Sequence, residues 1–117
     1  MQLARVIETS AAVAGTRSRT AKVAALAETL REASPEEVGV VTDYLAGRLP
    51  QRTVGVGWRG LQALPDPADA SSLTVHEVDV SLSRLRAFAG AGSTAERGAE
   101  LAALFGRATA EEQDWLV

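Results

Sequence analysis

The chain has 117 residues, the size of one domain, and its 46% hydrophobic and 23% charged residues are an ordinary balance for a globular protein. It has no cysteine and one histidine, which excludes disulfides, zinc–thiolate sites, iron–sulfur clusters and cysteine nucleophiles and argues against histidine-based catalysis. The sequence has no apolar run of about 18 residues and no signal-peptide pattern, so we expect a soluble, cytoplasmic protein.

The first half of the chain predicts three helices. Apolar residues spaced by three and four predict one helix over 2–13 and another over 17–32. The expected inward residues are Leu3, Val6, Ile7, Ser10 and Val13 in the first helix and Val23, Leu26, Ala27 and Leu30 in the second. Residues 34–37, Ser-Pro-Glu-Glu, predict a third helix, because serine caps, proline fits the first position and glutamate completes a capping box. This helix should end at Leu49 and Pro50.

The second half predicts three more helices after an irregular stretch. Two glycines in 51–57 argue against a regular strand, residues 58–64 suggest one helical turn, and two prolines make 65–72 the candidate hinge. A serine or threonine followed three residues later by glutamate predicts helix starts at 74–77, 93–96 and 109–112. Together with an alanine-rich composition, this predicts an all-α fold of about six helices in an irregular bundle with one glycine-containing loop.

Charge is unevenly distributed along this chain, whose net charge is −3. Three windows contain basic residues and no acid: 9–27, 44–65 and 80–95. If these windows share a face, that face can bind a polyanion although the molecule is acidic overall. The alternative is that gaps of this length between acidic residues arise by chance.

Three loop-to-helix junctions are candidates for binding phosphate, because the free N–H groups at a helix start attract anions. They lie at 15–22, 54–59 and 90–97 and combine cations or hydroxyls with glycines that allow close approach of the backbone. The candidate residues are Arg17, Arg19 and Lys22 at the first junction, Gly55, Gly57 and Arg59 at the second, and Gly90, Gly92, Ser93, Thr94 and Arg97 at the third. We expect these junctions to converge on one cradle for a sugar–phosphate backbone.

Each junction also has a purely structural interpretation. The first can be a capped helix with solvated arginines, the second a tight turn whose Trp58 fills the core, and the third a joint in which glycine ends a helix. The carboxylate pairs at 36–37 and 111–112 stand in first helical turns, where a favourable interaction with the helix dipole is a better explanation than acid–base catalysis. His76, in a similar position, is assigned no function.

Several sequence blocks occur in a recognisable order. They are Ala-Arg-Val-Ile-Glu-Thr-Ser at 4–10, Thr-Arg-Ser-Arg at 16–19, Lys-Val at 22–23, Asp-Tyr-Leu-Ala-Gly-Arg-Leu at 43–49, Val-Gly-Val-Gly-Trp at 54–58, Gly-Ala-Gly-Ser at 90–93, Arg97, and Leu-Phe-Gly-Arg-Ala-Thr-Ala-Glu-Glu-Gln at 104–113. In this order they resemble the helical N-terminal DNA-binding domain of ATP-dependent DNA ligases. The resemblance covers nearly the whole chain.

The resemblance implies that residues 1–117 are the N-terminal part of a domain that grips nicked duplex DNA by its backbone and minor groove, without reading sequence. The parent enzyme would seal nicks in DNA repair, replication or recombination, associated with the nucleoid. It would use ATP and magnesium and carry a nucleotidyltransferase domain and an OB-fold domain, both absent from this sequence.

The sequence departs from that family in one decisive motif. The family's adenylated lysine lies in Lys-x-Asp-Gly, whereas the single lysine here, Lys22, is followed by Val-Ala-Ala. We therefore expect no catalytic residue, cofactor or metal in this chain and no ligation by it alone. Its expected partners are nicked DNA, the remaining ligase domains and, through an apolar last helix that looks cut short, a second copy of itself. It should not bind membranes.

Two other classes of function remain open. The first is a helical protein-interaction or regulatory domain that does not bind nucleic acid, which the acidic net charge favours. The second is a small stand-alone enzyme, for which the sequence offers no recognisable pocket chemistry.

Overall fold

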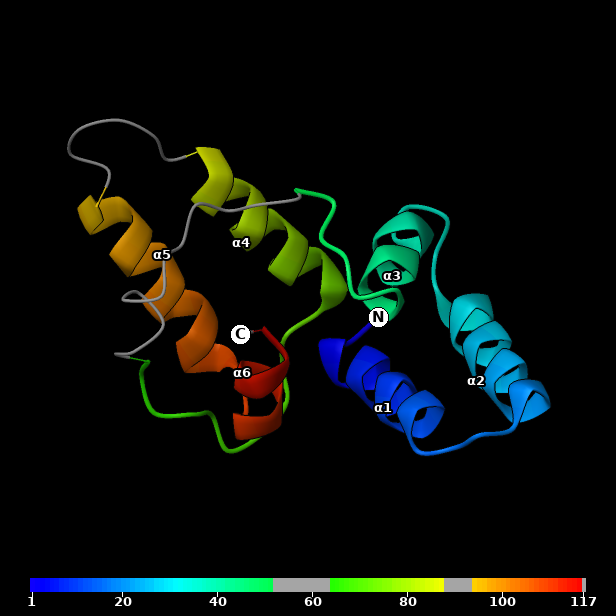
Figure 1. Cartoon of the computed structure of the whole chain (residues 1–117). Coiled ribbons are helices and arrows are strands. Elements are labelled where there is room, and N and C mark those ends of the chain that lie inside the picture. The colour runs from blue at the N-terminus through cyan, green and yellow to red at the C-terminus, as the bar shows by residue number, and fades with distance from the viewer. Residues whose placement is uncertain (52–63, 88–93, 117) are drawn as a thin grey trace.

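The computed structural model describes residues 1–51, 64–87 and 94–116. The predicted all-α fold is confirmed, and the number of helices agrees (Figure 1). The helices are α1 (Leu3–Ala14), α2 (Arg19–Glu32), α3 (Val38–Leu45), α4 (Val75–Ala87), α5 (Thr94–Arg107) and α6 (Ala110–Leu116). None of the helices in the described part of the chain is long and apolar enough to cross a membrane.

The helices form two groups that meet near the amino terminus (Figure 1). In the first group α1 packs on both α2 and α3, and in the second α4 packs on α5. Contacts of α1 with α6 and of α3 with α4 join the two groups. The first residues of the chain therefore lie at the centre of the molecule.

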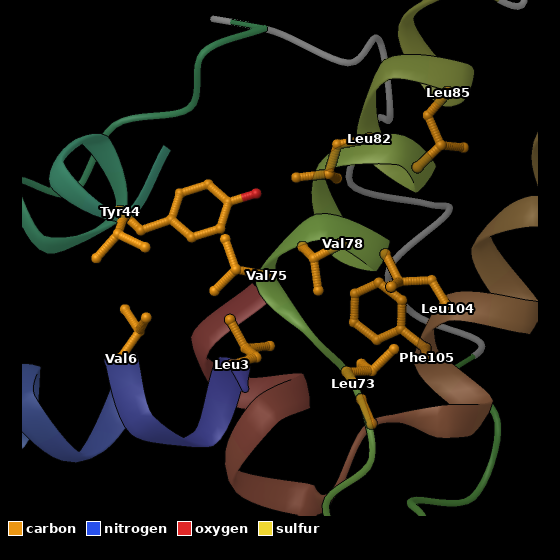
Figure 2. Packing of buried hydrophobic residues seen from close by; sticks show 12 residues of the cluster. Leu3, Val6, Tyr44, Leu73, Val75, Val78, Leu82, Leu85, Leu104 and Phe105 are labelled. Carbon is orange, nitrogen blue, oxygen red and sulfur yellow. The ribbon is translucent and has the colours of Figure 1, made fainter. Parts of the chain in front are cut away.

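A short backbone pairing holds the two groups together. The Leu3 amide donates to the Leu73 carbonyl at 2.9 Å, and the Val75 amide donates to the Met1 carbonyl at 2.8 Å. All three apolar side chains at this point, Leu3, Leu73 and Val75, are buried. Figure 2 shows them between Val6 and Tyr44 on one side and Leu104 and Phe105 on the other, so one hydrophobic cluster spans both groups.

Two predicted capping boxes are confirmed with both of their hydrogen bonds. The Glu77 amide donates to Thr74 Oγ1 and the Thr74 amide to Glu77 Oε1, each at 3.1 Å. In α6, the Glu112 amide donates to Thr109 Oγ1 at 3.3 Å, and the Thr109 amide donates to Glu112 Oε1 at 2.9 Å. These pairs satisfy backbone amides that have no partner inside the helix.

The third helix is shorter at both ends than the sequence predicts. Residues 35–37 form a turn, and α3 begins at Val38. The predicted end at Leu49 and Pro50 is wrong, because the chain leaves the helix at Gly47, whose φ is 76°. The Gly47 amide donates to the Tyr44 carbonyl and the Arg48 amide to the Asp43 carbonyl, the two bonds of a Schellman motif.

The connector over 65–72 is attached to the second group at three points. Gln113 Nε2 donates to the Pro65 carbonyl at 3.1 Å, the Ala68 amide to the Ala108 carbonyl at 2.8 Å, and Arg107 to the Ser72 carbonyl at 3.3 Å. The hinge assigned to this segment stays a prediction.

Gly47 gives a direct test of the end of α3. A Cβ at Gly47 would meet no atom within 4 Å, so Gly47→Ala is strained only through its positive φ and should lower the free energy of unfolding by about 1 kcal/mol. Gly39 also has open space around it, but it lies inside α3, where Gly39→Ala should raise the free energy of unfolding by about 0.5–1 kcal/mol. Urea unfolding of both variants measures these changes, and equal effects would contradict the assigned helix end.

Glu77 gives a test that depends on pH. Hydrogen bonds from the Arg107 guanidinium and the Thr74 amide lower the pKa of Glu77 to about 2. Because the folded pKa is depressed, the stabilisation is complete above the ordinary value of 4.5 and is lost as the pH falls toward about 2. Glu77→Gln keeps an oxygen that can accept the capping hydrogen bond but loses the negative charge beside Arg107. The variant should therefore be less stable than the wild type at pH 7 and equally stable near pH 2. Thermal unfolding should show no such convergence for Glu36→Gln, an exposed control.

Candidate nucleic-acid interface

The acid-free window 9–27 folds into the tip of a helical hairpin. It comprises the second half of α1, the turn after it and the first half of α2, and these segments meet at one end of the molecule (Figure 1). The acidic residues of the two helices, Glu8, Glu28 and Glu32, lie toward the other end of the hairpin. Folding thus concentrates the net charge of +3 carried by this window at one place.

The three cations of the tip have no carboxylate partner. Arg17 and Arg19 are exposed, Lys22 is half-buried, and none of them lies within 4.0 Å of an acidic oxygen in the part of the chain that the structure describes. Arg5, in contrast, lies 2.7 Å from Glu32 and 3.9 Å from Glu8. The hydrogen bond from Arg5 is the main cause that lowers the pKa of Glu32. Arg5 is thus paired at the base of the hairpin, whereas the three cations at its tip are unpaired.

The start of α2 is a capped helix terminus. Ser18 Oγ accepts a hydrogen bond from the Ala21 amide at 3.2 Å, and Thr16 Oγ1 accepts one from the Ser18 amide at the same distance. One of the free amides proposed for an anion is therefore occupied by Ser18, as the structural interpretation of this junction anticipates. An anion at the tip would therefore be bound by the cationic side chains more than by the backbone amides of the helix terminus.

Two buried threonines fix the hairpin, and sequence analysis missed both. The hydroxyls of Thr9 and Thr29 are 2.5 Å apart, and each is within hydrogen-bonding distance of the carbonyl four residues earlier. This local bonding lets a polar side chain be buried at the α1–α2 contact. The inward position predicted for Val23 is wrong, because Val23 is 61% exposed on the outer side of α2. Thr9 follows Val6 by three residues and Thr29 follows Leu26 by three, so each threonine lies at helical spacing from a residue predicted to face inward. That spacing is the signal that could have identified the contact.

Most of the other candidate contacts lie outside the described residues. These are Gly55, Gly57, Arg59, Gly90, Gly92 and Ser93. Thr94 is the first residue of α5, and Arg97 lies half-buried in its first turn. Figure 1 places the start of α5 and the start of α2 at opposite ends of the molecule, so these two junctions do not form one compact cradle.

One carboxylate of each pair has a structural role in this fold. Glu112, 1% exposed, serves the capping box of α6. Glu37 accepts hydrogen bonds from the Ser34 amide and from the amino group of Met1. Across residues 1–51, 64–87 and 94–116, no three acidic or histidine side chains gather closely enough to hold a metal ion.

Comparison with known proteins identifies relatives along the whole chain. A protein named probable DNA ligase from Nocardioides sp. is 54% identical over 119 residues, covering 97% of this chain and 23% of its own length. One of the same name from Kineococcus radiotolerans is 53% identical, covering 99% and 24%. DNA ligase B from Mycobacterium tuberculosis is 45% identical, covering 100% and 24%.

No family model and no solved structure matches the chain. The chain spans about a quarter of the length of the curated relatives that it matches. It is therefore homologous to one segment of proteins of the DNA ligase family.

Proposed function

We propose that this chain binds duplex DNA around a nick, without sequence preference, as part of an ATP-dependent DNA ligase. The observation that carries the proposal is the hairpin tip, where Arg17, Arg19 and Lys22 have no acidic partner in the described structure of an otherwise acidic molecule. The names of the relatives support a role in a ligase. DNA is the polyanion on which a ligase acts.

The chemistry of the tip suits a phosphate backbone. Arginine presents several donors to phosphate oxygens, lysine adds a point charge, and neither distinguishes one base from another at the backbone. The net charge of −3 does not oppose this role, because screening over about 10 Å makes the local charge decisive at ordinary ionic strength. A ligase must act at any nick, and backbone contacts meet that requirement.

The remaining functions are proposed for a longer ligase and not for these residues. We place there the use of ATP and magnesium, nick sealing in repair, replication or recombination, and association with the nucleoid. Contacts from 55–59 and 90–97 to DNA stay predictions. The alternative class, a helical interaction domain without nucleic-acid binding, differs in one measurable respect: it should not bind DNA at any salt concentration.

The hairpin tip can be tested by titrating fluorescently labelled nicked duplex with the chain and its variants. Arg17→Ala, Arg19→Ala and Lys22→Ala should each weaken binding several-fold at low salt, because each removes one phosphate contact. The slope of log K against log salt should become shallower by about one for each contact removed. Changing the base sequence of the duplex should leave the affinity unchanged.

Arg31→Ala is the matched control for these variants. Arg31 is also exposed and without an ion pair among the described residues, but it lies in the last turn of α2, roughly 18 Å along the helix from Arg19. Its removal should change the affinity less than removal of a tip cation. Equal losses for all four variants would show nonspecific attraction, and an absence of binding by the wild type would refute the proposed function.

A further inference from the structure

Helix α2 carries two of the tip cations, Arg19 and Lys22, but buries very little of its own surface. Thr29 is its one fully buried side chain, and it lies in the carboxy-terminal half of the helix. Leu30, beside it, packs against the hydrophobic cluster, whereas Val23 in the other half is 61% exposed. Figure 1 shows α2 at the edge of the molecule, beside α1 and α3. The contacts around Thr29 therefore determine how α2 is oriented.

A series of polar contacts crosses from α1 to α2 at this point. Arg5 Nη1 donates to Thr9 Oγ1 at 3.0 Å, and the hydroxyls of Thr9 and Thr29 are 2.5 Å apart. Thr29 Oγ1 lies 3.1 Å from the Ala25 carbonyl. When Thr9 donates to Thr29 and Thr29 donates to this carbonyl, each hydroxyl accepts one hydrogen bond and donates one. We call Arg5, Thr9 and Thr29 the polar joint.

Arg5 also holds the last turn of α2. Its Nη2 donates to Glu32 Oε2 at 2.7 Å, and its Nε donates to the same oxygen at 3.2 Å. These two nitrogens differ from the one that donates to Thr9, so one planar guanidinium contacts its own helix and α2 at the same time. The donors of Arg5 are thus used inside the fold, unlike those of the tip cations.

The polar joint lies near one end of α2, and the tip lies at the other end. Thr29 follows Arg19 by ten residues, so the start of α2 lies about 15 Å from the joint. A swing of about 10° at the joint would move that start by about 2.6 Å, whereas N–H···O hydrogen bonds tolerate a spread of about 0.5 Å. Residues 19–24 contain no fully buried side chain that could hold this half of the helix in place. The angle of α2 at the joint therefore decides where its cations lie.

We propose that Arg5, Thr9 and Thr29 are positioning residues for the DNA-binding tip. They contact no phosphate themselves, and they hold α2 at the angle at which the three tip cations reach one phosphate backbone together. This inference rests on the proposed function, because the tip must bind DNA for its position to matter. The joint itself can be measured without DNA.

Two variants that leave the net charge unchanged test the positioning role. Thr29→Val keeps the shape of the side chain but has no hydroxyl, and Arg5→Lys keeps the positive charge but cannot reach both Thr9 and Glu32 with one planar group. Each should weaken the binding of labelled nicked duplex several-fold at low salt. Thr29→Ser retains the hydroxyl and should restore the affinity. A folded Thr29→Val variant with the affinity of the wild type would overturn the proposal.

Thr42→Val is the matched control. The Thr42 hydroxyl donates to the Val38 carbonyl within α3 at 2.7 Å, and its side chain is exposed. Its removal deletes the same chemical group outside the joint and should leave the affinity unchanged. Circular dichroism at the temperature of the binding assay establishes that every variant is folded.

A background without the tip cations separates positioning from direct contact. In a chain that carries Arg17→Ala, Arg19→Ala and Lys22→Ala together, Thr29→Val and Arg5→Lys should not weaken the residual binding further, because no charged tip remains to be positioned. An equal loss in both backgrounds would show that the joint acts on DNA without the tip, and it would overturn the proposal.

Spin labels measure the joint in the absence of DNA. The sequence has no cysteine, so Val23→Cys on α2 and Ala99→Cys on α5, both at exposed positions, provide two specific labelling sites. Double electron–electron resonance should show a distance distribution that Thr29→Val and Arg5→Lys broaden and Thr42→Val does not. An unchanged distribution in Thr29→Val would contradict the joint, whatever happens to DNA binding. Failure of the wild type to bind DNA would refute the proposed function, and the distance distribution would still decide whether the joint holds α2.

Discussion

The pairing of the first three residues with 73–75 is the constraint on which the rest of this structure depends. Its backbone hydrogen bonds join residues that are 70 and 74 positions apart, and Leu3, Leu73 and Val75 are among the most deeply buried apolar residues of the described structure. Such a contact is entropically expensive to form, and the burial of Leu3, Leu73 and Val75 offsets that cost. Once it is made, α1 is fixed at the centre, and α2 is positioned by α1 and α3.

This arrangement explains why the cations of the hairpin tip are free. α2 lies at the periphery and packs through one side only, on α1 and α3. The acidic residues of the hairpin stand near its base, where Arg5 joins Glu8 and Glu32. The tip therefore adds little to stability through charge pairing, and its three cations remain accessible to an external anion. Surface ion pairs contribute little in any case, so leaving these cations unpaired costs the fold almost nothing.

Local signals in the sequence predicted the helices well. Thr74 with Glu77 and Thr109 with Glu112 form their boxes as expected, because capping depends only on residues within one turn. The end of α3 was misplaced because Leu45 and Leu49 continue the apolar spacing, and this spacing concealed the glycine stop between them. Leu49 still reaches the core, from the irregular segment after Gly47.

Features that depend on tertiary packing could not be predicted in this way. Val23 was predicted to face inward because apolar residues recur at helical spacing along α2. The actual contact of α2 with α1 uses Thr29 instead, and Val23 is exposed. The single cradle required α2 and α5 to begin at the same place, and no local pattern contains that information. The cavity lined by Tyr44, Leu82 and Trp115 likewise arises from α3, α4 and α6 meeting in space.

The central claim is that the tip of the α1–α2 hairpin contacts the backbone of duplex DNA. Amide chemical shifts of the isotopically labelled chain, recorded as nicked duplex is added at low salt, test it residue by residue. The largest changes should fall within 15–23 and reverse when salt is raised, while the chemical shifts of amides in α6 stay unchanged. Changes confined to other parts of the chain, with the hairpin tip unaffected, would contradict the claim.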